Sequence, residues 1–228
     1  MTEQEQLLGG RIILEGVTGS KAYGLDTPES DEDIKGVYLL PTDKVLSLGF
    51  NRDKTTKDHT DPDWVYHELE KFMHLAMKGN PTITEMLWLN DYTKLSPEGQ
   101  LLVDNRELFL NNVVYKSYGG YALSQARKLN ARGSSYSSAL KNRKAKHTRH
   151  CYRLLMQGKE LLETGKLTVR VTPEEREYLF WIGEQPVEVI LEEFERQFKE
   201  FDKIPSVLPE EPDYDKINNL LLQIRKAN

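Results

Sequence analysis

Two acidic residues separated by one position, Asp31 and Asp33, stand at the start of an apolar run that continues to residue 40. If residues 31–40 form a strand, both carboxylates point to the same face, about 6–7 Å apart, because side chains alternate between faces. Two like charges held together are costly without a cation between them. Carboxylate oxygens suit a hard divalent ion such as Mg²⁺ or Mn²⁺, which also keeps water and substrate phosphate as ligands. The pair therefore predicts a metal site.

A second short segment, Gly19–Ser20, precedes the aspartates and contributes different chemistry. Glycine lets the backbone approach a phosphate group closely. A serine hydroxyl and the N–H groups that follow it at a strand-to-helix turn attract an anion. Lys21 comes next and either reaches a phosphate or is simply solvated. Together, the two segments predict a site for a metal-bound triphosphate, with Gly19, Ser20 and Lys21 on the nucleotide.

Several short elements must position these residues. The apolar run at residues 11–17 predicts a strand that leads into Gly19–Ser20, and residues 21–25 predict a short helix. Turn-forming residues follow, and residues 33–40 predict a second strand. Residues 63–68 predict a third strand, followed by a helix with apolar residues at helical spacing. The fold is therefore expected to place the site on a small sheet.

The spacing of Gly19–Ser20 and Asp31-x-Asp33 resembles the signature of the DNA polymerase β nucleotidyltransferase superfamily. The longer string GSKAYGLDTPESDEDIKGVYLLP resembles one branch, the nucleotidyltransferases that include the RNA-ligase-associated, RlaP-like group. Further similar strings follow: HELEKFMHLAMKGNPTITEMLW, KHTRHCYRLLMQGKELLETGKLTVRV and LPEEPDYDKINNLLLQIR. The resemblance therefore covers nearly the whole chain.

This resemblance implies a mixed sheet flanked by helices and a C-terminal helical part. It also implies transfer of a nucleotidyl group from an NTP to a hydroxyl-bearing acceptor, such as an RNA end, with release of pyrophosphate. Two metal ions would be held by three carboxylates, of which Asp31 and Asp33 are two. Association with RNA ligases implies a role in RNA repair.

The third carboxylate in the superfamily stands on a strand beside the aspartate pair, so residues 63–68 supply the candidates. We prefer Glu68 as the third catalytic and metal-binding acid, because relatives in the resembling branch commonly have an acid before the Leu-x-Lys of the next helix. Asp63 is the alternative, although the start of a strand or a turn also explains it. Glu85 lies in a resembling string too, but Thr82–Glu85 has the form of a capping box, which explains Glu85 without chemistry.

A basic segment at residues 116–159 forms the second notable feature. No Asp or Glu occurs between Glu107 and Glu160, although the formal net charge of the whole chain is −5. Its basic residues are Lys116, Arg127, Lys128, Arg132, Lys141, Arg143, Lys144, Lys146, Arg149, Arg153 and Lys159. Such charge separation indicates a positive surface that meets RNA or another polyanionic acceptor. The alternative is a helical face that docks on the acidic remainder.

Three residues of this segment, Lys146, His150 and Arg153, share one face of a predicted helix. The family resemblance places that helix opposite the sheet, where it closes over the nucleotide. Lys146 and Arg153 would then contact phosphates, and His150 would bind a phosphate, the acceptor or merely a neighbouring helix. These three residues complete the predicted nucleotide-binding set.

Composition limits the class of protein. The chain has 228 residues, 38% hydrophobic and 29% charged, which argues against disorder and fibrous repeats. Its single cysteine, Cys151, excludes a disulfide framework and a cysteine-based zinc site. No apolar run approaches the roughly 20 residues of a membrane span, and the polar, acidic start does not suit a signal peptide. We therefore expect a cytoplasmic protein with no membrane partner.

The expected architecture is α+β: a small mixed β-sheet nucleotidyltransferase domain at residues 1–97 and a helical domain with a basic face at residues 98–228. A capping box, Thr172-Pro-Glu-Glu175, marks one helix start in the second part. Two functions fit this architecture. The first is a metal-dependent nucleotidyltransferase, and the second is a non-catalytic nucleotide- or nucleic-acid-binding module on the same fold.

Overall fold

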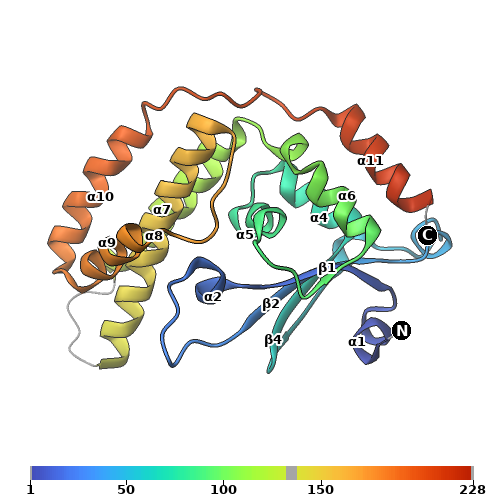
Figure 1. Cartoon of the computed structure of the whole chain (residues 1–228), viewed down its shortest axis with the longest axis horizontal. Helices are drawn as coiled ribbons and strands as arrows, with labels where there is room; N and C mark the ends of the chain where they lie inside the picture. The colour runs from blue at the N-terminus through green and yellow to red at the C-terminus, as the bar shows by residue number, and fades with distance from the viewer. Residues whose placement is uncertain (1, 132–137, 227–228) are drawn as a thin grey trace. The chain divides into compact units, whose positions relative to one another are not determined.

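The computed structural model describes residues 2–131 and 138–226 (Figure 1). The chain forms two compact units, one made of Met1–Leu110 together with Pro212–Asn228, the other of Asn111–Glu211. The expected domains had one boundary after residue 97. The units differ from that expectation because the chain returns to the first unit in its last helix.

The first unit contains a five-stranded sheet with strand order β3-β4-β2-β1-β5. The strands are β1 (Arg11–Thr18), β2 (Asp33–Leu39), β3 (Thr56–Thr60), β4 (Asp63–Glu68) and β5 (Lys94–Leu95). β2 and β4 are parallel, whereas every other pair is antiparallel. The expected fold class, a mixed sheet followed by helices, is thus confirmed, and three strands lie within one residue of their expected bounds.

The edge strand β3 had no clear sequence signal. Its residues are polar or charged, and all but the first are exposed. It forms a hairpin with β4, in which Thr60 pairs with Asp63 across the turn at Asp61–Pro62. An edge strand with both faces open to water needs no apolar alternation, which explains why the sequence pattern does not reveal it.

Helices cover the sheet in the first unit. They are α1 (Glu3–Leu8), α2 (Gly19–Tyr23), α3 (Thr42–Val45), α4 (Leu69–Met77), α5 (Pro81–Thr84), α6 (Pro97–Asp104) and α11 (Tyr214–Lys226), with short 3₁₀ turns η1 (Arg52–Lys54), η2 (Glu85–Trp88) and η3 (Arg106–Phe109). Figure 1 shows α4, α5 and α6 on the same side of the strands.

The start of α5 corrects one expectation. Asn80, and not Thr82, caps this helix, since its side-chain oxygen accepts a hydrogen bond from the Thr82 N–H at 3.1 Å. Pro81 occupies the first helical position, where its missing N–H costs nothing. The predicted capping box at Thr82–Glu85 therefore does not form, and Glu85 is left for another role.

The sheet is buried at one end and open at the other. Val37 and Tyr38 are neighbours in β2 and point to opposite faces, yet both are almost fully buried. Packing therefore covers both faces there. The first three residues of β2, from Asp33 to Lys35, are only half-buried. Asp33, one of the predicted metal ligands, lies at this open end.

The second unit is helical. It consists of α7 (Val113–Ala131), α8 (Ser138–Thr164), α9 (Pro173–Glu184) and α10 (Val187–Phe201). The capping box at Thr172 is present, with both of its hydrogen bonds to Glu175. Tyr118 of α7 and Tyr152 of α8 are fully buried in this unit. Among the helices that the structure describes, none combines the length and the apolarity needed to cross a membrane.

Candidate active site

Gly19 and Asp33 meet directly where β1 ends and β2 begins. Gly19 has a φ of +68°, which favours glycine, and a Cβ there would lie 2.0 Å from Oδ2 of Asp33. The carboxylate thus occupies the space that any other side chain would need. Thr18 pairs with Asp33 across the two strands, and its hydroxyl donates to the Asp33 carbonyl at 3.1 Å. The predicted phosphate cradle and one predicted metal ligand therefore lie together.

Asp31 differs from this expectation. β2 begins at Asp33, so Asp31 precedes the strand and is exposed. The reason is the length of its neighbour: β1 ends at Thr18, opposite Asp33, and turns into α2, so no partner strand continues alongside residues 31 and 32. The alternation rule that placed Asp31 and Asp33 on one strand face therefore does not apply to Asp31.

The other residues of the predicted cradle lie in α2. Ser20 is half-buried in the first turn of this helix. The Lys21 ammonium forms an ion pair with Glu32 at 3.0 Å, and both side chains are exposed. An exposed pair of this kind contributes about 0–1 kcal/mol, so it does not prevent Lys21 from moving to a more highly charged anion.

The strand register places Glu68 far from Asp33. In the parallel pair of β2 and β4, Ile34 lies opposite Trp64 and Tyr38 lies opposite Glu68. At about 3.3 Å per residue, Glu68 is about 16 Å further along the sheet than the start of β4. It is 1% exposed and caps α4, with Oε2 accepting from the Glu70 N–H at 2.9 Å.

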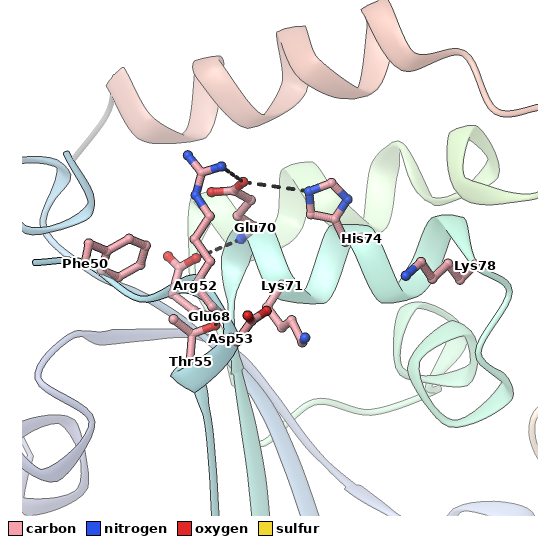
Figure 2. A pocket seen from close by; sticks show the side chains of 9 residues that line it. All are labelled: Phe50, Arg52, Asp53, Thr55, Glu68, Glu70, Lys71, His74 and Lys78. Carbon is pink, nitrogen blue, oxygen red and sulfur yellow. Dashed lines mark hydrogen bonds and ion pairs between the residues drawn. The ribbon is translucent and has the colours of Figure 1, made fainter. Parts of the chain in front are cut away.

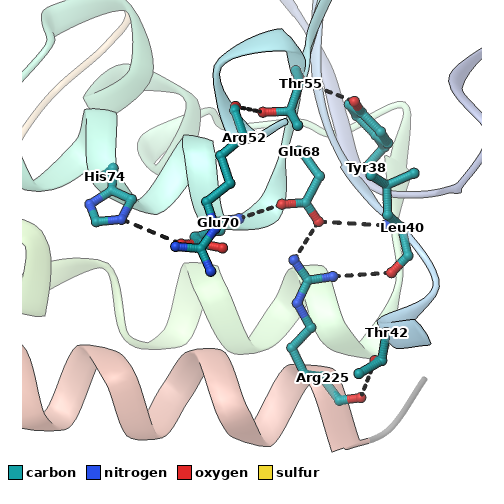
Figure 3. Close-up of polar contacts among 9 residues, drawn as sticks. All are labelled: Tyr38, Leu40, Thr42, Arg52, Thr55, Glu68, Glu70, His74 and Arg225. Atoms are coloured by element: carbon teal, nitrogen blue, oxygen red, sulfur yellow. Dashed lines mark hydrogen bonds and ion pairs between the residues drawn. The ribbon is translucent and has the colours of Figure 1, made fainter. Parts of the chain in front are cut away.

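The second oxygen of the Glu68 carboxylate takes part in a buried ion pair (Figure 3). Its Oε1 accepts a hydrogen bond of 2.5 Å from Arg225 of α11, and the same guanidinium donates to the carbonyl of Leu40 at 3.0 Å. Both oxygens of Glu68, the preferred third metal ligand, are therefore hydrogen-bonded within the protein. Its carboxylate holds the last helix to the sheet, at the end opposite Asp33.

A shallow cavity of about 260 Å³ opens beside Glu68 (Figure 2). Basic and acidic side chains mix around it, and Glu70 pairs with both Arg52 at 3.4 Å and His74 at 3.7 Å. Because the cavity lies at the Glu68 end of β4, it is separate from the contact between Gly19 and Asp33.

The alternative acid, Asp63, begins the strand next to that of Asp33. Ile34 and Trp64 are paired in the parallel register, so the residues before them, Asp33 and Asp63, begin neighbouring strands and point to the same face. Adjacent strands are about 4.8 Å apart. Asp63 is exposed, whereas Asp33 is half-buried against Gly19. The register thus brings together an aspartate pair that differs from the predicted one.

His67, at the Glu68 end of β4, is a further residue that the sequence did not single out. It lies on the same face of β4 as Asp63 by strand alternation, and its Nδ1 is 2.9 Å from the Thr56 hydroxyl. Burial, with a smaller contribution from the ammonium groups of Lys35 and Lys71, lowers the pKa of His67 to about 4. The imidazole is therefore neutral at physiological pH. A lone histidine within a strand gives no sequence signal of such surroundings.

The donor set near Gly19 suits a divalent metal. Within residues 2–131 and 138–226, no three His, Cys, Asp or Glu side chains are grouped to hold an ion. Mg²⁺ is nevertheless commonly bound by one or two carboxylates together with substrate phosphates. Asp33 and Asp63 offer two such carboxylates, and Asp31 adds a third on the adjoining turn. These residues fit a metal that arrives with a nucleotide.

The three predicted nucleotide ligands of the basic segment are not equivalent. Lys146 is exposed and His150 is half-buried. Arg153 is 1% exposed, donates to Gln157 at 2.5 Å and lies 3.3 Å from Nδ1 of His150. All three residues lie in α8, as the helical spacing predicted, but the Arg153 guanidinium is buried among side chains of the helical unit and not on its surface.

The other basic residues divide in the same way. Lys144 donates to the Gln185 carbonyl at 2.7 Å, and Arg149 lies 4.5 Å from the ring of Phe180. The exposed ones are Lys116, Arg127, Lys128, Arg143, Lys146 and Lys159. Arg132 and the side chain of Lys141 lie outside the described residues. The segment is therefore partly structural and partly a positive surface.

Comparisons with known proteins agree with these motifs. A family model described as RlaP, RNA repair pathway DNA polymerase beta family, matches residues 1–179. An "Uncharacterized 38.9 kDa protein in nrdC-mobD intergenic region" of Enterobacteria phage T4 is 30% identical over 138 residues. That alignment covers 54% of this chain and 40% of the phage protein, so the chain spans less than half of that relative's length.

Proposed function

Because the chain belongs to the RNA repair pathway DNA polymerase beta family, we propose that it transfers a nucleotidyl group from an NTP to a hydroxyl-bearing acceptor. The acceptor oxygen attacks the α-phosphorus, and pyrophosphate leaves. The observation that supports this most is the contact between Gly19 and Asp33, which sets a carboxylate against a turn that only glycine can form. This contact joins the two halves of the family motif in space.

The residues at the open end of the sheet have different proposed roles. Asp33, Asp63 and Asp31 would hold Mg²⁺ or Mn²⁺, as two ions in the family's pattern. When bound, such ions neutralise charge on the phosphates and lower the pKa of the acceptor hydroxyl. Gly19 and Ser20 bind the triphosphate through the backbone and the hydroxyl. In a displacement of this type the protein mainly positions groups.

The basic face of the second unit supports a polyanionic acceptor such as an RNA end. Its exposed cations include Lys116, Arg127, Lys128, Arg143 and Lys146, and no acidic residue interrupts the sequence from 108 to 159. Binding through such cations releases counterions, so affinity falls steeply as salt rises. We expect charge reversal at Arg127 and Arg143 to weaken acceptor binding without changing affinity for the NTP.

A second candidate is a binding module without turnover. It is favoured by the exposed position of Asp31 outside the strand, and by the lack of a three-acid cluster in the described part of the chain. Such a module would bind nucleotide or nucleic acid equally well after loss of the aspartates. Turnover therefore separates the two candidates.

The test measures pyrophosphate release and label transfer from each NTP, with Mg²⁺ and a panel of RNA ends. Asp33→Asn keeps the size of the side chain, and Asp58→Asn on the exposed edge strand β3 is the matched control. We expect Asp33→Asn and Gly19→Ala to lower kcat/KM at least about a hundredfold. An effect of this size is typical when a metal no longer stabilises charge in the transition state. Asp58→Asn should retain full activity. Activity that survives in Asp33→Asn, or a wild type inactive with every NTP and acceptor, would exclude the enzyme.

A further inference from the structure

We propose that Glu85 is a positioning residue for the Gly19–Ser20 turn and acts through Tyr23. This inference rests on the proposed function, because it concerns how that turn is held for the triphosphate. Glu85 lies outside the Gly-Ser and Asp-x-Asp motif of the nucleotidyltransferases. The capping box predicted at Thr82–Glu85 does not explain it either, because Asn80 caps α5.

The contact is a buried hydrogen bond between two elements. Tyr23 is the last residue of α2 and is 9% exposed. Its hydroxyl donates to Oε1 of Glu85 at 2.5 Å. Glu85 is the first residue of η2 and is 1% exposed. Burying a hydroxyl or a carboxylate is costly without a partner, so each group holds the other in place.

Acids from two other elements thereby fix both ends of α2. At its start, Gly19 packs against the Asp33 carboxylate, and at its end, Tyr23 is bonded to Glu85. Gly24 closes the helix with a φ of +70°, and the N–H of Leu25 donates to the Ser20 carbonyl at 2.9 Å. Ser20 is thus held between two anchored ends.

The short length of α2 makes this anchoring necessary. The helix has five residues, whereas isolated helices below about 12–15 residues are marginal in water. Its conformation therefore depends on tertiary contacts more than on its own hydrogen bonds. Loss of the Tyr23 hydroxyl should loosen the turn that precedes it, and the effect should fall on the triphosphate and not on the acceptor.

The experiment compares Tyr23→Phe with Tyr92→Phe. Both variants lose one phenolic hydroxyl near η2, but the Tyr92 hydroxyl donates to the carbonyl of Met86, within η2 itself, at 2.9 Å. We expect Tyr23→Phe to raise the KM for NTP about five- to tenfold, as for the loss of one buried hydrogen bond, with the KM for the acceptor substrate unchanged. Tyr92→Phe should keep both KM values.

Variants of Glu85 supply the rescue. Glu85→Gln keeps an acceptor oxygen for the Tyr23 hydroxyl and should stay within about twofold of wild type, whereas Glu85→Leu should match Tyr23→Phe or exceed it. A general loss of folding would instead change both KM values together, or lower the active fraction in all variants. Equal KM values for NTP in Tyr23→Phe and Tyr92→Phe would overturn the inference.

Hydrogen exchange provides a readout that needs no turnover. We expect the amides at residues 20–25 to exchange about five- to tenfold faster in Tyr23→Phe and at the wild-type rate in Tyr92→Phe. If the wild type turns over no NTP, the proposed function fails while exchange still tests the anchoring. If exchange at these amides is unchanged in Tyr23→Phe, the inference fails, whatever Asp33→Asn does to turnover.

Discussion

The two ends of the parallel strands β2 and β4 carry carboxylates in opposite situations. At one end, Asp33 begins β2, half-buried against the Gly19 turn, and the exposed Asp63 begins β4. At the other end, Glu68 is buried and bonded to Arg225 and to the backbone of α4. A carboxylate open to solvent can accept a metal or a substrate, whereas one whose oxygens are already paired stabilises the fold. The comparison shows that the role of an acidic residue in a strand depends on which groups surround its carboxylate.

The largest expected effect concerns which end is catalytic. We expect Asp63→Asn to lower kcat/KM at least about tenfold, because it removes a carboxylate from the end that holds Asp33. Glu68→Gln should leave kcat/KM per folded molecule within about twofold, because Glu68 is about 16 Å along the strand. Steady-state kinetics, corrected for the folded fraction, would measure both. A large loss in Glu68→Gln with no loss in Asp63→Asn would reverse the comparison.

The second largest expected effect is on the free energy of unfolding, through the ion pair at the Glu68 end of the sheet. Arg225→Met leaves a buried carboxylate without its ion partner, which costs about 3–5 kcal/mol of unfolding free energy. Lys216→Met, in the same helix as Arg225, is the matched control. It breaks an exposed ion pair with Asp213 and should lower the free energy of unfolding by less than about 1 kcal/mol. Urea unfolding measures both. Equal costs would show that the Arg225 pair is no anchor for α11.

The smallest effect is a pH dependence at His67, which precedes Glu68 in β4. The pKa of His67 in the folded chain, about 4, lies below the ordinary 6.5, so the unfolded chain binds the proton more readily. Stability therefore falls as pH drops from about 6.5 towards 4, and His67→Gln should flatten this slope. The carboxyls of Glu5 and Glu98, with pKa values lowered to about 2, act only below about 4.5. Urea midpoints between pH 4.5 and 6.5 isolate His67, and an unchanged slope in His67→Gln would contradict its burial.

Local patterns in the sequence were sufficient for much of the site. The apolar run in residues 33–40 predicted β2, and the Gly19–Ser20 and Asp33 motifs predicted one shared site, where the structure sets Gly19 against the Asp33 carboxylate. Both depend on neighbours along the chain. The edge strand β3 and the burial of Arg153 were missed because the sequence does not show what packs against a polar segment or a helix face.

The sequence by itself determined the strands at the centre of the sheet, the glycine turn beside Asp33 and the family, because these follow from short motifs and from alternation over a few residues. Only the tertiary structure decided which acid joins Asp33. That choice depends on the register of β2 against β4, which places Asp63 beside Asp33 and Glu68 at the far end. It also depends on Arg225, more than 150 residues after Glu68 in the chain, which returns to bind the buried carboxylate. Contacts between segments so far apart leave no local pattern.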